Sequence, residues 1–135
     1  MILVDTSVWI DYFNGNMTWQ TDLLEKYLSA TPIIMGDLIL TEVQQGFSTD
    51  KDFETAKAFL GVLPFRSMGG YHVALQSAQN YRKLRKAGIT VRKTMDVIIA
   101  TFCMIEGLIL LHADRDFEPI AAHFPLKTCA PSTRG

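Results

Sequence analysis

The chain has 135 residues, the usual size of one domain, so two independently folded domains would each have only a marginal core. Apolar residues make up 48% of the sequence and charged residues 20%, a balance that excludes a disordered or collagen-like protein. The net charge is −1, no apolar run reaches the roughly 18 residues of a membrane span, and the amino terminus lacks signal-peptide features. We therefore expect a cytoplasmic protein with no membrane contact.

Short apolar strands alternate with helices along the chain. Residues 2–4 form an apolar run that stops at helix-capping residues, which predicts a buried strand leading directly into a helix. Further strands are predicted at 33–35, 63–65, 108–111 and 126–128, and further helices at 18–31, 37–47, 50–62, 70–87, 94–106 and up to about 123. Asp37 and Thr94 are the expected caps of their helices. Because the strands are continuously apolar, they indicate a parallel sheet covered on both faces.

We predict a single domain over residues 1–130, because no linker or low-complexity run divides the chain. Residues 131–135 are expected to form a flexible tail. The helix at 94–106 is apolar nearly all round, which predicts that it packs on both sides at the centre of the molecule.

Acidic residues recur where predicted strands end and predicted helices begin. Asp5 follows the first strand, and Asp114 and Asp116 follow the fourth. Asp96 lies in the first turn of the most apolar helix, and Glu42 interrupts an otherwise apolar one. In open α/β sheets these strand ends and helix starts meet at one edge, where ligands bind. The sequence therefore predicts carboxylates from several segments at one place.

Carboxylates that converge within about 6 Å repel one another unless a cation neutralises them. Ligands that are all oxygens favour Mg²⁺ or Mn²⁺ over zinc, and such an ion promotes phosphodiester hydrolysis. Thr6 and Ser7 are candidates to hold a water or a phosphate oxygen.

Each acid also has an ordinary structural interpretation when it is taken alone. Asp5 and Asp96 would serve as helix caps or first-turn acids, and Asp114 and Asp116 as turn residues. Glu42 would face solvent. The three histidines have no ligand spacing and receive no role.

Four ordered motifs together resemble a PIN domain of the VapC toxin type. They are ILVDTSVWIDYF, LTEVQQGF, YRKLRKAGITVRKTMDVIIA and LLHADRDFEPIA, and the similarity runs from residue 2 to about 128. The resemblance implies a PIN-like three-layer α/β/α fold with a short central parallel sheet. It also implies a metal-dependent endoribonuclease, using Mg²⁺ or Mn²⁺, that leaves a 5′-phosphate on its RNA products. Such a protein is the toxin of a toxin–antitoxin pair, so we expect a cognate antitoxin as partner, and a homodimer.

The resemblance also implies site residues, because each acid of the family's quartet falls inside its matching motif. The catalytic and metal-binding acids implied in this way are Asp5, Glu42, Asp96 and Asp114. Thr6 matches the hydroxyl that follows the first acid, and Asp116 is expected to assist.

Six of the 13 lysines and arginines lie between residues 82 and 93. Arg92 and Lys93 lie close to Asp96 and are predicted to clamp RNA phosphates, with Arg82 and Arg85 on the preceding helix as further candidates. The alternative is a solvated helix face.

Two predicted helices carry more aromatic residues than one small core obviously needs. These residues are Trp19, Tyr27, Phe53 and Phe59, which suit a groove for an antitoxin segment or simply the core. The alternative overall function is a PIN-fold RNA-binding or scaffold protein without turnover. A phosphorylated receiver domain is disfavoured, because no aspartate ends a middle strand and no lysine ends a late one.

Overall fold

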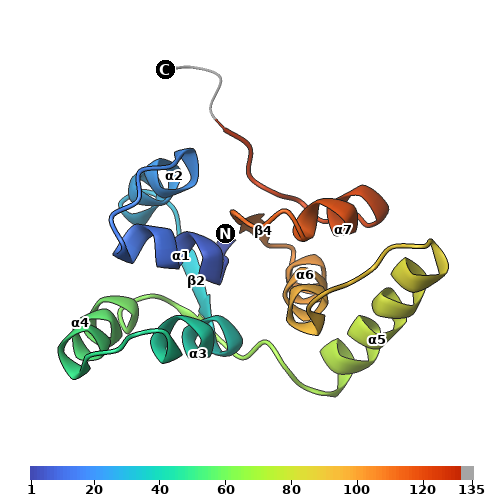
Figure 1. Cartoon of the computed structure of the whole chain (residues 1–135), viewed down its shortest axis with the longest axis horizontal. Helices are drawn as coiled ribbons and strands as arrows, with labels where there is room; N and C mark the ends of the chain where they lie inside the picture. The colour runs from blue at the N-terminus through green and yellow to red at the C-terminus, as the bar shows by residue number, and fades with distance from the viewer. Residues whose placement is uncertain (132–135) are drawn as a thin grey trace.

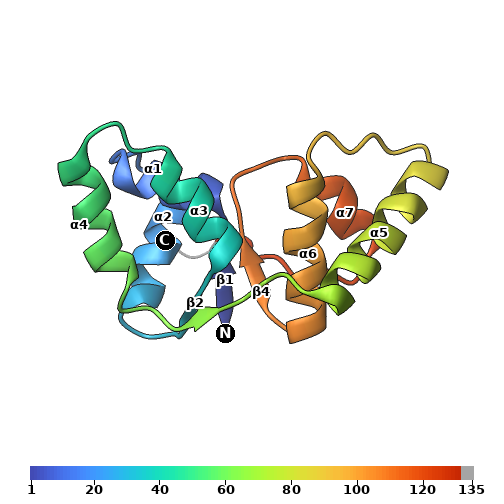
Figure 2. The same ribbon diagram turned by 90° about the horizontal axis from the view of Figure 1, so that it is seen from below.

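The computed structural model describes residues 1–131. Its elements in chain order are β1 (Ile2–Val4), α1 (Thr6–Phe13), α2 (Trp19–Leu28), β2 (Ile33–Gly36), α3 (Asp37–Gln45), α4 (Asp50–Leu60), β3 (Phe65–Arg66), α5 (Tyr71–Lys86), α6 (Thr94–Glu106), β4 (Ile109–Leu111) and α7 (Phe117–His123). The strands pair in parallel in the order β3-β2-β1-β4. Helices α1 to α4 lie on one side of the sheet and α5 to α7 on the other (Figures 1 and 2). The predicted three-layer α/β/α fold is confirmed.

The central strand β1 brings the two halves of the molecule together. Leu3 pairs with Ile34 of β2 on one side and with Leu110 of β4 on the other, and all three side chains are buried. The backbone N–H of Asp5 donates to the carbonyl of Leu111 at 2.8 Å, so pairing with β4 continues to the end of β1. Since the strands are parallel, the segments that follow β1 and β4 emerge at the same edge.

Helix α6 is the buried helix that its composition predicts. It contacts α5, α7 and β4, and its buried apolar residues are Val97, Ile99, Ala100, Phe102 and Cys103. Gly107 ends the helix at φ +66°, a conformation that glycine adopts without steric cost. The buried Asn80 amide donates to the Thr101 hydroxyl at 3.0 Å, which fixes α5 against α6. This packing gives the first turn of α6 a rigid support.

Two of the predicted helix caps are wrong, because each residue lies one position further along. Gly36 caps α3 and Asp37 is the first helical residue. Asp37 Oδ1 instead accepts the backbone N–H groups of Leu38 at 2.9 Å and Met68 at 2.8 Å, so a contact distant in sequence fixes its place. Lys93, not Thr94, occupies the capping position of α6.

Some predicted boundaries also shift. Helix α2 ends at Leu28, three residues before the prediction, because the segment that precedes Pro32 turns away from helical geometry. Likewise α3 ends at Gln45 and α4 at Leu60, each followed by a glycine. The third strand is β3 rather than 63–65, because Met35 and Gly36 pair with its two residues.

The last predicted strand, at 126–128, is only a single bridge between Leu110 and Thr128. Most of the predicted flexible tail, residues 132–135, lies outside the described residues. Within residues 1–131, every helix is too short or too polar to cross a membrane.

Candidate active site

The first acid of the site is held by the turn between β1 and α1. Asp5 caps α1: its Oδ2 accepts the backbone N–H of Ser7 at 3.0 Å and the hydroxyl of Ser7 at 2.6 Å. The same hydroxyl oxygen accepts the backbone N–H of Ala113 at 3.0 Å. Ser7 therefore joins the start of α1 to the loop that follows β4. From the sequence, Ser7 was predicted to hold a water or a phosphate oxygen, and its bridging contact was missed. The available signal was its position two residues after Asp5, a predicted helix cap.

Three acids form the tightest group. Carboxylate oxygens of Asp96, Asp114 and Asp116 all lie within 4.8 Å of one another, and we call these residues the acidic trio. Asp96 comes from the first turn of α6, and the other two come from the loop between β4 and α7. The backbone N–H of Asp116 donates to Asp114 Oδ1 at 2.9 Å, which fixes the turn. Asp116, predicted only to assist, thus stands beside two members of the predicted quartet.

Asp5 and Glu42 lie outside the trio but connect to it. The charge of Asp5 is close enough to raise the pKa of Asp96. Glu42, half-buried in α3, accepts the hydroxyl of Thr6 at 2.8 Å. Glu42 is therefore joined to the residue that follows Asp5, and the structure shows a partner for the carboxylate that the sequence left without one.

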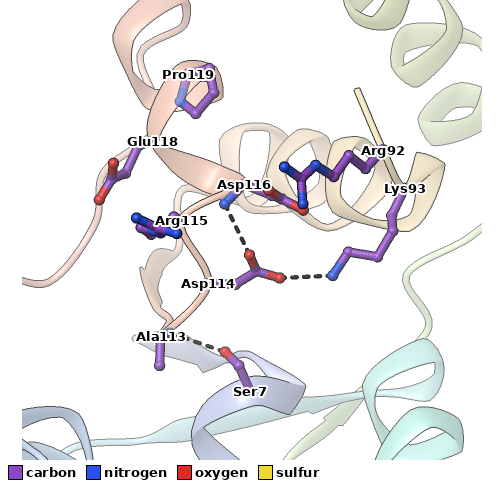
Figure 3. A pocket seen from close by; sticks show the side chains of 9 residues that line it. All are labelled: Ser7, Arg92, Lys93, Ala113, Asp114, Arg115, Asp116, Glu118 and Pro119. Atoms are coloured by element: carbon purple, nitrogen blue, oxygen red, sulfur yellow. Dashed lines mark hydrogen bonds and ion pairs between the residues drawn. The ribbon is translucent and has the colours of Figure 1, made fainter. Parts of the chain in front are cut away.

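Lys93 reaches into the trio from the capping position of α6. Its Nζ donates to Asp114 Oδ2 at 2.7 Å (Figure 3). The same Nζ lies 3.6 Å from Asp96 Oδ2. The hydrogen bond to Asp114 raises the pKa of the Lys93 ammonium to about 12. Burial raises the pKa of the Asp114 carboxyl, but hydrogen bonds from Lys93 and from the Asp116 backbone outweigh it and leave that pKa below its usual value. Lys93 was predicted as a phosphate clamp, and here its ammonium is bound to the acids.

Asp96 is an acid whose surroundings disfavour its ionised form. Burial raises its pKa to about 6; the nearby Lys93 ammonium opposes the shift, and the Asp114, Asp5 and Asp116 charges add to it. Its Oδ2 is buried and has no hydrogen-bond partner within residues 1–131. An ionised Asp96 carboxylate therefore has the charge of Lys93 nearby, with Nζ 3.6 Å from Oδ2, but not the hydrogen bond that buried polar oxygens normally accept.

These features suit a divalent cation. The trio supplies oxygen ligands only, which hard ions such as Mg²⁺ and Mn²⁺ prefer. Asp96 Oδ2, which has no hydrogen-bond partner within residues 1–131, already has one positive charge nearby, the Lys93 ammonium at 3.6 Å. Asp96, Asp114 and Asp116 are therefore the residues that would hold a metal ion.

An open pocket of about 890 Å³ lies beside the acids (Figure 3). Its lining residues are Ser7, Arg92, Lys93, Ala113, Asp114, Arg115, Asp116, Glu118 and Pro119. Of the four predicted phosphate-binding residues, only Arg92 and Lys93 line this pocket. Arg82 lies at a different pocket between α5 and α6, and the Arg85 guanidinium lies over the ring of Tyr81.

Sequence reasoning missed Arg115, which lines this pocket between two acids of the trio. The alternation of acid and base in residues 114–116 was the available signal. His112, which received no predicted role, packs its ring against Phe117 with centroids 4.9 Å apart. Its Nδ1 accepts the backbone N–H of Asp114 at 3.3 Å, and burial lowers the pKa of its imidazole. His112 thus helps to position the Asp114 loop as a neutral ring.

This chain is similar to known proteins both in sequence and in fold. The PIN domain family matches residues 2–122. Ribonuclease VapC11 of Mycobacterium tuberculosis is 32% identical over 123 residues, which cover 90% of this chain and 92% of that protein. A VapC ribonuclease of Mycobacterium bovis matches with the same identity and coverage.

Two solved structures illustrate the shared fold at low identity. VapBC2 of Rickettsia felis, bound to a DNA fragment from its promoter, gives a TM-score of 0.75 at 17% identity over 96% of this chain and 98% of that one. The sarcin-ricin loop cleaving toxin VapC20 of Mycobacterium tuberculosis gives 0.64 at 17% identity over 92% and 96% of the two chains. With the family match and the VapC relatives, these likenesses lead to one conclusion: the chain belongs to the PIN domain family, among the VapC ribonucleases.

Proposed function

We propose that residues 1–130 act as a single PIN domain that hydrolyses RNA phosphodiester bonds with Mg²⁺ or Mn²⁺, as the toxin of a toxin–antitoxin pair. The observation that carries this proposal is the acidic trio, which places cation-binding oxygens beside a pocket that also carries Arg92 and Arg115. The relatives named ribonucleases, 32% identical to this chain, support the same activity.

The roles of the residues follow from their contacts. Asp96, Asp114 and Asp116 would hold the ion, with Asp5 beside them. When bound, the ion supplies Lewis-acid stabilisation of charge that develops on the phosphate and promotes ionisation of water. Ser7 holds Asp5 and the Asp114 loop in a fixed relation, and Glu42 orients the hydroxyl of Thr6. Without a cation these carboxylates would repel an RNA phosphate, which is why we expect catalysis to require metal.

We expect the purified protein to cut total cellular RNA when Mg²⁺ or Mn²⁺ is present and to leave it intact when a chelator is present. The reason is that the trio attracts phosphate only after its charge has been neutralised. The measurement is the appearance of discrete fragments on a denaturing gel, with calcium, a hard ion that binds oxygen ligands in looser geometry, as a comparison.

Binding of RNA without cleavage at any metal concentration would contradict this expectation. It would favour the alternative function, a PIN-fold RNA-binding protein without turnover.

Replacing Arg92 by alanine is expected to weaken RNA binding and to flatten its salt dependence. Each lost phosphate contact removes about 0.7 from the slope of log affinity against log salt for a single strand. Arg92 lines the pocket and makes no salt bridge with any residue in 1–131, so its charge is available to a phosphate. RNA affinity is measured across a salt series in an Asp96→Asn background, which keeps the RNA intact.

Arg82→Ala is the matched control, because Arg82 carries the same charge on α5 away from this pocket. An equal loss of slope for both variants would mean that general surface charge, and not the pocket, attracts the RNA.

The antitoxin partner is expected to cover exposed aromatic residues on α2 and α4. Trp19 and Phe59 are 36% and 38% exposed, and Phe59 packs against Trp9, Tyr12 and Phe13 of α1. Phe53 is 37% exposed beside an apolar pocket of about 460 Å³. Co-expression with the neighbouring small reading frame should give a co-purifying complex and relieve growth arrest. Phe53→Ser should weaken that complex, because the apolar contact area is lost.

Leu75→Ser is the comparison variant, since Leu75 is an exposed apolar residue on α5, on the other side of the sheet. Failure of both co-purification and growth relief would leave the toxin assignment without support. The homodimer stays a prediction, which sedimentation equilibrium of the isolated protein would check.

A further inference from the structure

Lys93 links two acids that belong to different segments of the chain. Its Nζ lies 2.7 Å from Asp114 Oδ2 and 3.6 Å from Asp96 Oδ2, at the pocket drawn in Figure 3. The Lys93 side chain is 52% exposed, whereas those of Asp96 and Asp114 are 7% and 23% exposed. A half-exposed lysine thus places its charge against acids that are much less exposed than itself.

Neighbouring Arg92 provides an internal contrast. Arg92 lines the same pocket and is also exposed, yet within residues 1–131 it forms no ion pair with an acid. Two consecutive positive side chains therefore differ: Lys93 offsets part of the negative charge of the acidic trio, and Arg92 leaves its charge available on the pocket wall.

Lys93 contacts one carboxylate oxygen on each of two acids that would hold a metal ion. Asp96 Oδ2 and Asp114 Oδ2 face the ammonium, and Asp96 Oδ2 has no hydrogen-bond partner among the described residues. Two positive charges cannot occupy one set of carboxylate oxygens without strong mutual repulsion. A divalent ion that binds either of these oxygens would therefore compete with the ammonium of Lys93.

We propose that Lys93 is a tethered counter-ion that competes with the divalent cation for Asp96 and Asp114 and so sets the metal concentration at which the site fills. This inference rests on the proposed function, because it requires that the acidic trio binds metal. In the metal-free protein the lysine offsets part of the trio's negative charge. When metal binds, its ammonium leaves the acids and is free to meet a phosphate, which gives the predicted clamp a metal-dependent role.

The expected effect can be scaled from the known influence of a charge on a carboxylate. An opposite charge within about 4–6 Å shifts a carboxylate pKa by roughly 1–3 units, and the same attraction must be overcome when the lysine is displaced. Since the Lys93 side chain remains half in water, we take the low end of that range. Removal of its charge should tighten metal binding by on the order of tenfold.

The experiment is a calorimetric titration of Mn²⁺ into the metal-free protein and three variants. Lys93→Met removes the charge and keeps the length of the chain, and it should bind Mn²⁺ about tenfold more tightly than the wild type. Lys93→Arg keeps the charge and should stay within about threefold of the wild type. Arg92→Met is the matched control, which removes a neighbouring positive charge that makes no contact with the acids. Circular dichroism verifies that each variant is folded.

The possible results separate this inference from the function on which it rests. If the wild type binds Mn²⁺ and Lys93→Met binds it equally or more weakly, the inference is overturned and the metal site stands. If Arg92→Met tightens binding as much as Lys93→Met, general charge near the pocket explains the effect and the inference is again overturned. If neither the folded wild type nor folded Lys93→Met binds Mn²⁺, the proposed metal site fails, and the inference fails with it.

Discussion

Asp96→Asn is expected to abolish RNA cleavage, with a loss of at least about 100-fold in kcat/KM, while the fold remains intact. Asparagine has nearly the same shape as aspartate, so the packing of α6 is preserved. The substitution removes the charge of a buried carboxylate whose Oδ2 has no hydrogen-bond partner within residues 1–131. Because burial disfavours the ionised form of Asp96, removing its charge should not destabilise the folded protein. The charge is needed, however, to hold a cation. The measurement is the initial rate of cleavage at saturating Mg²⁺, together with the melting temperature.

Asp50→Asn is the matched control, because Asp50 is an exposed aspartate at the first position of α4. It should cleave RNA at the wild-type rate. The inactive Asp96→Asn protein, purified in the same way, also excludes a contaminating ribonuclease as the source of activity. Cleavage by Asp96→Asn at the wild-type rate would show that Asp96 is only a first-turn residue of α6.

Most of the fold could be predicted from local sequence signals. Continuous apolar strands such as β1 and β4 are typical of parallel sheets that are covered on both faces. Helix ends shift by local causes, such as Pro32 after α2, whereas two other errors arise where a contact distant in sequence decides the outcome. Asp37 leaves the expected capping role because Met68, 31 positions away, supplies a backbone donor to its carboxylate. The predicted strand at 126–128 stays a single bridge because only Leu110 pairs with it.

The candidate site shows the same division between local and distant information. The position of each acid after a strand or in a first turn predicted that they would share one edge. The distances between them depend on side-chain placement across segments, which no local pattern specifies. Lys93 lies three residues from Asp96, but its shorter contact is to Asp114, 21 positions away. The sequence therefore indicated which residues gather, and the structure was needed to separate the acidic trio from Asp5 and Glu42.

In the absence of metal, the protein is expected to become more stable as the pH falls from 7 to 4.5, relative to Asp96→Asn. Burial, first of all, raises the pKa of Asp96 to about 6, above its ordinary value of 3.8. The folded protein therefore binds a proton more tightly than the unfolded chain in this interval. The stability that Asp96 contributes is complete below pH 3.8 and is lost as the pH rises through about 6. In full it amounts to about 3 kcal/mol, of which about 2 kcal/mol is lost between pH 4.5 and 7.

The comparison with Asp96→Asn is essential, because His112 acts in the opposite direction. Burial lowers the pKa of its imidazole, so His112 contributes stability that is lost on acidification, and this contribution cancels between the two proteins. Urea unfolding at a series of pH values measures the difference in stability between the two proteins.

Saturating Mn²⁺ should reverse the sign of this pH dependence, since the ion binds the ionised trio. By mass action it stabilises the folded state by about 2.7 kcal/mol at 100 times Kd. At low pH protons compete with the metal for Asp96, so the metal-bound protein should be most stable near pH 7. A pH profile of the difference that is unchanged by Mn²⁺ would show that Asp96 takes no part in binding the ion.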